Sequence, residues 1–138
     1  MKERRKAREI ALAFLYQWEV RGDEVLAEME DVLLKDRRGP ECSEYTRTLV
    51  RGTIEHRERI DGLLAEAAEH WRIERMAAVD RNLLRIAVFE MDQRREDVPP
   101  KVAINEAIEL AKRFSTENSG AFVNGVLDRV RRTLELPA

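Results

Sequence analysis

The sequence has few of the features that mark secreted, membrane-bound or disulfide-stabilised proteins. Cys42 is its one cysteine, so no intramolecular disulfide can form, and a lone thiol fits a reducing compartment. No run of residues approaches the about 20 apolar residues that a membrane-spanning helix needs. We therefore expect a cytoplasmic protein that makes no contact with a membrane.

Residue patterns typical of enzymes are also missing. The two histidines, His56 and His70, lie far apart and belong to no HExxH or cysteine-rich metal-ligand pattern. Cys42 has no neighbouring motif that would activate its thiol, and the chain has neither a glycine-rich phosphate loop nor a GxSxG motif. The many carboxylates are expected on solvated helix faces. We predict a protein that is not an enzyme and has no catalytic residue, cofactor or metal.

An excess of charge of one sign is absent too. The 138 residues carry a net charge of −2, so any nucleic-acid binding has to rest on a local patch. Arginine outnumbers lysine by 20 to 5, a bias that genome composition or heat adaptation would each produce. The hydrophobic content of 43% supports a packed core, and the length fits one domain over residues 1–138.

Apolar residues recur at helical spacing almost everywhere, whereas strand-like alternation is absent, so the sequence predicts an all-α fold. Residues 43–70 form one long helical stretch, in which Gly52 and Gly62 predict a kink or a division into two helices. Residues 79–94 are apolar on nearly every side, which is typical of a helix at the centre of a bundle. We expect a first helix that ends at Gly22, followed by helices over 23–34, 43–70 and 79–94. A further helix should run from the prolines at 99 and 100 to 114, and the last helix should begin after 120. We expect the breaks between helices at 37–40, 71–76, 97–100 and 115–120.

The first helix begins with a dense basic cluster. Five positive charges fall in the first eight residues, and they are Lys2, Arg4, Arg5, Lys6 and Arg8. Cations at a helix N-terminus face the positive end of the helix dipole, an arrangement that costs about 0.3–1 kcal/mol per exposed charge. Binding to a polyanion would explain the pattern, since these side chains could contact successive phosphates. The alternative is a frayed, solvated tail.

The same helix has a second face of interest. Its core stripe runs from Ile10 to Trp18 and leaves Leu12, Tyr16 and Val20 on the opposite side. An exposed apolar row that includes a tyrosine suggests a protein partner, while packing against a neighbouring helix is the alternative.

The loop before the last helix, within FSTENSGAFVNG, is the third candidate. Asn118 and Ser119 suit a helix cap, and Gly120 permits close approach of a ligand to the backbone. The helix that follows offers free N–H groups to a phosphate. Phe114, which ends the core stripe expected for its helix, and Phe122 flank the loop. An aromatic ring there can stack an unpaired base, although Phe122 by itself suits the core.

Three segments together resemble the NusB family of bacterial transcription antitermination factors. Residues 97–130, DVPPKVAINEAIELAKRFSTENSGAFVNGVLDRV, are similar to the C-terminal signature of that family. VDRNLLRIAVFEM (79–91) resembles its central helix, and RRKAREIALAFLYQWEV (4–20) resembles its first helix. The resemblance implies a fold of about seven helices in two small bundles. It also implies binding to boxA RNA of ribosomal RNA operon leaders, as a heterodimer with the ribosomal protein NusE. Other Nus factors and RNA polymerase would then be indirect partners.

The resemblance assigns roles to particular positions. Its RNA contacts fall on Arg4, Arg5, Lys6 and Arg8 in the basic cluster, and on Asn118, Phe122 and Asn124. We add Lys2 as an RNA contact because it belongs to the same basic cluster. Its surface for NusE falls on Tyr16, Val20, Glu74 and Asp80, the two acids facing a basic protein. Position 118 can be acidic in this family, and an asparagine there should not weaken binding to RNA phosphates.

Two alternatives remain open. One is a protein-only helical scaffold, or a homodimer through Tyr16 when NusE is absent. The other is a NusB-like RNA-binding domain related to those of ribosomal RNA cytosine methyltransferases, although no cofactor-binding βαβ module follows in this sequence.

Overall fold

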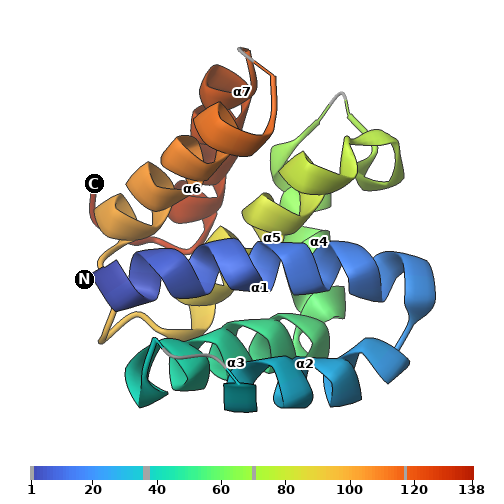
Figure 1. Cartoon of the computed structure of the whole chain (residues 1–138). Coiled ribbons are helices and arrows are strands. Elements are labelled where there is room, and N and C mark those ends of the chain that lie inside the picture. Colours follow the sequence, from blue (N-terminus) through green and yellow to red (C-terminus); the bar gives the residue numbers. More distant parts are fainter. Residues whose placement is uncertain (1, 36–37, 70, 117) are drawn as a thin grey trace. The chain divides into compact units, whose positions relative to one another are not determined.

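The computed structural model describes residues 2–35, 38–69, 71–116 and 118–138, and these contain helices and no strand (Figure 1). The elements are α1 (Lys2–Arg21), α2 (Glu24–Lys35), α3 (Pro40–Glu55), α4 (Arg57–Ala67), the short 3-10 helix η1 (Ile73–Arg75), α5 (Ala78–Gln93), α6 (Pro100–Phe114) and α7 (Ser119–Thr133). The all-α prediction is confirmed. The chain divides into two compact units, unit 1 (Met1–Gly52) and unit 2 (Thr53–Ala138). One domain over residues 1–138 stays a prediction.

The predicted stretch 43–70 is two helices, and it begins earlier than expected, at Pro40. Proline suits the first position of a helix because its missing N–H would have no partner there. The division falls at His56, whose φ of −99° and ψ of 16° leave the helical range, while Gly52 and Gly62 both lie inside helices. Neither glycine therefore interrupts its helix, and the backbone conformation at His56 separates α3 from α4.

In unit 1, α1 and α2 pack against each other after a tight turn. Gly22 has a φ of +85°, a conformation that favours glycine, and its N–H donates to the carbonyl of Trp18 at 2.8 Å. The indole Nε1 of Trp18 donates to Asp23 Oδ1 at 2.8 Å. Asp23 therefore fixes the turn through Trp18, and Trp18 is half-buried and not wholly in the core as the sequence suggested.

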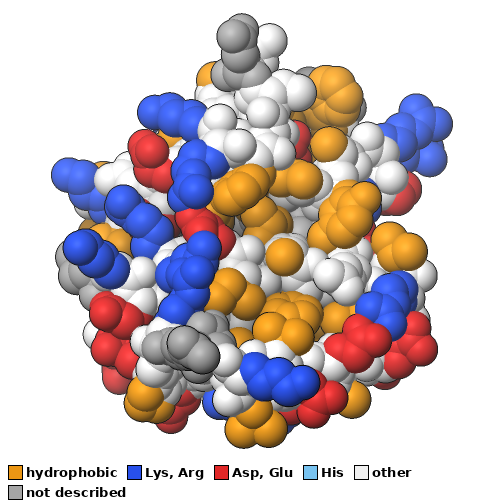
Figure 2. Space-filling model, in the orientation of Figure 1, with side chains coloured by type: hydrophobic (Ala, Val, Ile, Leu, Met, Phe, Trp, Pro, Cys, Tyr) orange, Lys and Arg blue, Asp and Glu red, His pale blue; other side chains and the backbone are white. Residues whose placement is uncertain are grey.

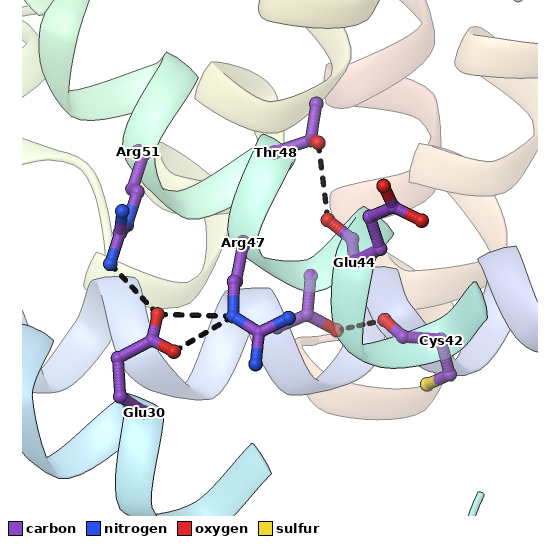
Figure 3. A network of polar contacts seen from close by, with 7 residues as sticks. Glu30, Cys42, Glu44, Arg47, Thr48 and Arg51 are labelled. Atoms are coloured by element: carbon purple, nitrogen blue, oxygen red, sulfur yellow. Dashed lines mark hydrogen bonds and ion pairs between the residues drawn. The ribbon is translucent and has the colours of Figure 1, made fainter. Parts of the chain in front are cut away.

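A branched ion pair joins α2 to α3 (Figure 3). Glu30 on α2 accepts from Arg47 Nε at 2.8 Å through Oε2 and from Arg51 Nη2 at 2.8 Å through Oε1. The hydroxyl of Thr48 donates to the Glu44 carbonyl at 3.1 Å within α3. One carboxylate thus holds two guanidinium groups on successive turns of α3 and fixes that helix beside α2.

The buried face of α1 is wider than the core stripe that the sequence predicted. Leu12 was expected on the outer face, but it is only 6% exposed, whereas Tyr16 and Val20 are exposed. Taken at 100° per residue, the buried arc from Phe14 to Leu12 spans roughly 160°. Leu12 lies at the edge of that arc and Tyr16 just beyond it, so the predicted row of three is a row of two.

In unit 2, α5 is the central helix and packs against α4, α6 and α7. Every residue from Asn82 to Asp92 is buried, which confirms the prediction for 79–94. The buried polar residues on α5 include Arg85, Glu90 and Asp92. A buried charge needs a partner to avoid a large desolvation cost, so these side chains determine how α5 is held.

Two bidentate ion pairs join α5 to α4. Arg85 donates to Asp61 through Nε at 2.9 Å and through Nη2 at 3.0 Å. Arg59 donates to Asp92 through Nε at 2.6 Å and through Nη2 at 2.8 Å. Hydrogen bonds from the Arg59 guanidinium hold the pKa of Asp92 below its usual range, because they stabilise the ionised carboxylate.

We predict that Asp92→Asn lowers the free energy of unfolding by about 1–3 kcal/mol at pH 7, because the amide loses the charge-assisted pair with Arg59. The folded pKa of Asp92 is depressed, so its contribution is complete above the unfolded pKa of about 3.9 and is lost as the pH falls through the lower folded value. Urea unfolding of both proteins from pH 7 to pH 2.5 measures this, and the two curves should converge at the acid end.

The matched control is Asp97→Asn, which removes a carboxylate from the more exposed pair with Arg94 at 2.7 Å. It should cost at most about 1 kcal/mol. A difference between wild type and Asp92→Asn that stayed constant down to pH 2.5 would contradict the role given to the ionised pair.

Candidate functional site

The basic start of α1 presents some of its cations to solvent and folds others inward. Lys2 and Arg5 are exposed, and Lys6 is half-buried, with its Nζ 3.0 Å from Glu9 Oε2. Figure 2 shows Lys and Arg side chains gathered over the N-terminal end of α1. These three residues supply the surface positive charge that the sequence predicted there.

Arg4 and Arg8 lie on another side of the helix, four residues apart and so nearly in line. The guanidinium carbon of Arg4 lies 4.4 Å from the centroid of the Tyr45 ring, and that of Arg8 lies 5.8 Å from it. Arg8 is only 4% exposed. Tyr45 belongs to α3, so these cation–π contacts fix the start of α1 within unit 1 and leave Arg8 little surface for an RNA contact.

The predicted partner face of α1 is reduced to two residues. Tyr16 is 47% exposed and Val20 is 74% exposed, one turn apart. Tyrosine is among the residue types that are enriched in protein-binding hot spots, and Val20 extends the exposed apolar surface beside it.

In unit 2, Ser119 holds the loop that precedes α7. Its buried hydroxyl donates to Asp80 Oδ2 at 3.3 Å, and its Oγ lies 2.8 Å from Ser115 Oγ and 3.0 Å from Thr116 Oγ1. A serine hydroxyl has one proton, so Ser115 and Thr116 are the donors of the two shorter bonds. The loop is therefore tied to the first turn of α5.

The two predicted acids differ in their surroundings. Glu74 is exposed on η1, whereas Asp80 is half-buried in the first turn of α5. One carboxylate oxygen of Asp80 accepts from Ser119, and the other, Oδ1, is buried with no hydrogen-bond partner among the described residues. Asp80 thus has one carboxylate oxygen engaged by Ser119 and one unpaired oxygen that lies beneath the surface.

The two phenylalanines that flank this loop occupy different places. Phe114 was expected in the core stripe of its helix, but it is 45% exposed, because it is the last residue of α6, where the chain turns into the loop. The guanidinium carbon of Arg113 lies 5.0 Å from its ring centroid. Phe122 is half-buried and forms an edge-to-face pair with Trp71, with ring centroids 6.1 Å apart.

The polar residues predicted around this loop are open to solvent. Asn118 is exposed at the N-cap position of α7 and makes no side-chain cap hydrogen bond, so the predicted capping role is wrong for Asn118. Asn124 is exposed on α7. A Cβ added at Gly120 would lie 3.7 Å from Ile108 Cγ2, an ordinary contact, so packing within the chain does not require this glycine. Glu117 lies outside the described residues.

Residues 2–35, 38–69, 71–116 and 118–138 contain neither a metal-ligand cluster nor a membrane-spanning helix. No group of His, Cys, Asp and Glu side chains there is arranged to hold a metal ion. No helix among these residues combines the length and the apolar character that crossing a membrane requires. His70 is not among the described residues.

A family model covers nearly the whole chain. The model of the NusB family matches residues 5–132. This chain belongs to the NusB family. Its curated relatives include the transcription antitermination protein NusB of Solibacter usitatus, 47% identical, with 99% of this chain and 94% of the relative covered. The protein of the same name from Symbiobacterium thermophilum is 48% identical, with 96% and 91% covered.

Solved NusB structures share the fold. T. maritima NusB superposes with a TM-score of 0.81 at 40% identity, covering 94% of this chain and 90% of that one. A crystal structure of the antitermination factors NusB and NusE in complex with double-stranded RNA has a TM-score of 0.83 at 30% identity, covering 96% and 98%. The predicted resemblance to the NusB family is thus confirmed in both sequence and fold.

Some contacts that shape the NusB-family site were not predicted from the sequence. Arg129 Nη1 on α7 donates to the Ala67 carbonyl at the end of α4, at 3.0 Å. Arg81 Nη1 donates to the carbonyls of Ile73 and Met76, at 3.1 and 2.9 Å, and so holds η1 in place. Neither contact leaves a periodic pattern. The excess of arginine over lysine was the available signal, because a guanidinium can donate to several carbonyls at once.

We predict that Ser119→Ala lowers the free energy of unfolding by about 1–3 kcal/mol, because the hydroxyls of Ser115 and Thr116 and the carboxylate of Asp80 lose their shared, buried partner. Alanine is a good helix former, so the loss would come from the hydroxyl and not from helix propensity. Urea unfolding followed by circular dichroism measures it. Ser115→Ala removes a single donor and should cost less; a cost equal to or above that of Ser119→Ala would show that Ser119 is not the centre of the network.

Proposed function

We propose that this NusB-family chain is a transcription antitermination factor that binds boxA RNA of ribosomal RNA operon leaders together with NusE. It acts as a cytoplasmic adaptor without catalytic activity of its own. Through NusE and other Nus factors it joins a complex on RNA polymerase that suppresses premature termination. The proposal rests on membership of the NusB family together with the exposed basic start of α1.

The RNA contacts are proposed on both units. On unit 1 we assign phosphate contacts to Lys2, Arg5 and Lys6, whose side chains reach the surface. Arg4 stays a contact through the part of its side chain that Tyr45 leaves open, while Arg8 would act mainly by supporting Arg4 through their common stack on Tyr45. Their placement against the dipole of α1 opposes stability, so binding is the better explanation of the cluster.

On unit 2 the proposed contacts are Asn118, Phe122 and Asn124. Asn118 and Asn124 are exposed amides that can hydrogen-bond base edges, and Phe122 supplies an aromatic surface. A net charge of −2 means that binding depends on these local groups and not on the field of the whole molecule.

The partner face is proposed on Tyr16 and Val20 of unit 1 and on Glu74 and Asp80 of unit 2. The first pair offers exposed apolar surface, and the second offers carboxylates to a basic partner, with Glu74 exposed and Asp80 half-buried. Self-association through Tyr16 in the absence of NusE is the second candidate, and the exposure of that ring favours it.

We predict that Arg5→Gln weakens boxA binding about 10-fold at low salt, because one charged phosphate contact is lost. The slope of log affinity against log salt concentration should fall by about 0.7, the value for one charge on single-stranded nucleic acid. Electrophoretic shift of a boxA oligomer with NusE present, at several salt concentrations, measures both quantities.

The matched control is Lys35→Gln, which removes an exposed cation from the end of α2 and should leave affinity and slope unchanged. An equal effect of the two variants would mean that the start of α1 holds no RNA contact. Equal affinity of the wild type for boxA and for a scrambled RNA, with NusE present, would contradict the proposed specific recognition of boxA.

We predict that Tyr16→Ala weakens NusE binding about 30-fold, the loss typical of a hot-spot aromatic residue. Val32→Ala shortens a comparably exposed apolar side chain on α2 and should have little effect. Isothermal titration calorimetry gives the affinities. Sedimentation at micromolar concentration tests the alternative, and a wild-type homodimer that NusE does not disrupt would remove Tyr16 from the NusE surface.

A further inference from the structure

Among the large hydrophobic residues that the structure describes, Trp71 has the most exposed aromatic side chain. It is 60% exposed, compared with 47% for Tyr16 and 45% for Phe114. A ring of this size left in water forgoes the gain from burial, so folding stability does not explain a tryptophan at this position. The exposure calls for an explanation in terms of a ligand.

The indole is nevertheless held in a defined place. The ring plane of Trp71 and that of Phe122 meet at 73°, and their centroids are 6.1 Å apart, so the two rings form an edge-to-face pair. The backbone N–H of Trp71 donates to the Ala68 carbonyl at 2.7 Å, and Arg129 fastens the neighbouring Ala67 carbonyl. Trp71 therefore loses little conformational entropy when a ligand binds to it, which favours affinity.

An edge-to-face contact covers at most one face of one ring. With Trp71 60% exposed and Phe122 half-buried, the open aromatic surface of the pair belongs mainly to the indole. Phe122 lies on the first turn of α7, which begins after the loop that Ser119 anchors. The exposed amide of Asn118 is at the same end of that helix.

The chemistry of this surface suits an unpaired nucleotide. Aromatic faces stack bases, an exposed amide can hydrogen-bond a base edge, and the start of a helix attracts a phosphate. The charged residues beside Trp71 are balanced, with Glu69 and Glu74 against Arg72 and Arg75, all exposed. Attraction of phosphates by excess positive charge is thus weak here, and stacking would supply most of the affinity.

We propose that Trp71, supported from the side by Phe122, is the base-stacking residue of the RNA site, and that an unpaired base of boxA lies on its indole face. The inference rests on the proposed RNA-binding function and extends it, because Phe122 then acts as a positioning residue and Trp71 makes the contact.

Fluorescence can observe this contact directly, since the chain has two tryptophans. In the Trp18→Phe variant all tryptophan emission comes from Trp71, and in Trp71→Phe it comes from Trp18. Titration of the Trp18→Phe variant, with NusE present, should show saturable quenching by boxA RNA at the same midpoint as the electrophoretic shift. The Trp71→Phe variant should bind RNA with little change in emission from Trp18.

Affinity provides a second readout. Trp71→Ala should weaken boxA binding about 5- to 150-fold, the range for loss of one stacked base. The factor should be the same at 50 and 200 mM salt, because no charge is removed, whereas a variant that removes a phosphate contact changes the salt slope. Trp71→Phe keeps an aromatic face and should restore most of the affinity. Leu34→Ala, which trims another exposed apolar side chain, is the control.

The outcomes separate this inference from the proposed function. If the wild type binds boxA but Trp71 emission is unchanged, or Trp71→Ala binds as tightly as wild type, the inference fails and the proposed function stands. Emission that responds to NusE alone and not to RNA would make Trp71 a protein contact and overturn the inference. Absence of boxA binding by the wild type with NusE would overturn both. Circular dichroism of each variant excludes unfolding as the cause of lost affinity.

Discussion

Two ion pairs of opposite sense between α4 and α5 determine the arrangement of unit 2. Arg85 on α5 meets Asp61 on α4, and Asp92 on α5 meets Arg59 on α4. Sliding one helix along the other by a turn would break both pairs and separate the buried Arg85 and Asp92 from their partners on α4, at a cost of up to about 3–5 kcal/mol for each. One register is therefore strongly favoured. The position of Asp80 at the start of α5, and through it the loop at Ser119, follows from that register.

The proposed site combines two kinds of interaction that respond differently to the surroundings. The start of α1 offers exposed cations, whose attraction for phosphates weakens as salt rises. The start of α7 offers amides and the aromatic pair of Trp71 and Phe122, whose contribution is largely independent of salt because these groups carry no charge. Charge can bring many RNAs to such a protein, whereas stacking and amide contacts distinguish the RNA whose bases are unpaired at the right place.

Periodicity in the sequence was sufficient for the helices, because each buries a stripe that repeats every three or four residues. It also identified α5 as central, since apolar residues cover that helix all round. It was wrong where one residue decides the outcome. Leu12 lies at the edge of a wide buried arc, and Phe114 continues its stripe but comes last in its helix. Arg8 packs on Tyr45, 37 positions away, and such contacts between distant residues leave no local pattern.

The division of labour between arginine and lysine has a consequence for covalent modification. The ion pairs and carbonyl caps that hold unit 2 together are made by guanidinium groups, among them those of Arg59, Arg81, Arg85 and Arg129. The sequence has five lysines, and two of them, Lys2 and Lys6, lie in the basic start of α1. Acylation of amines would therefore neutralise part of the proposed RNA surface while leaving the internal framework of the fold chemically untouched.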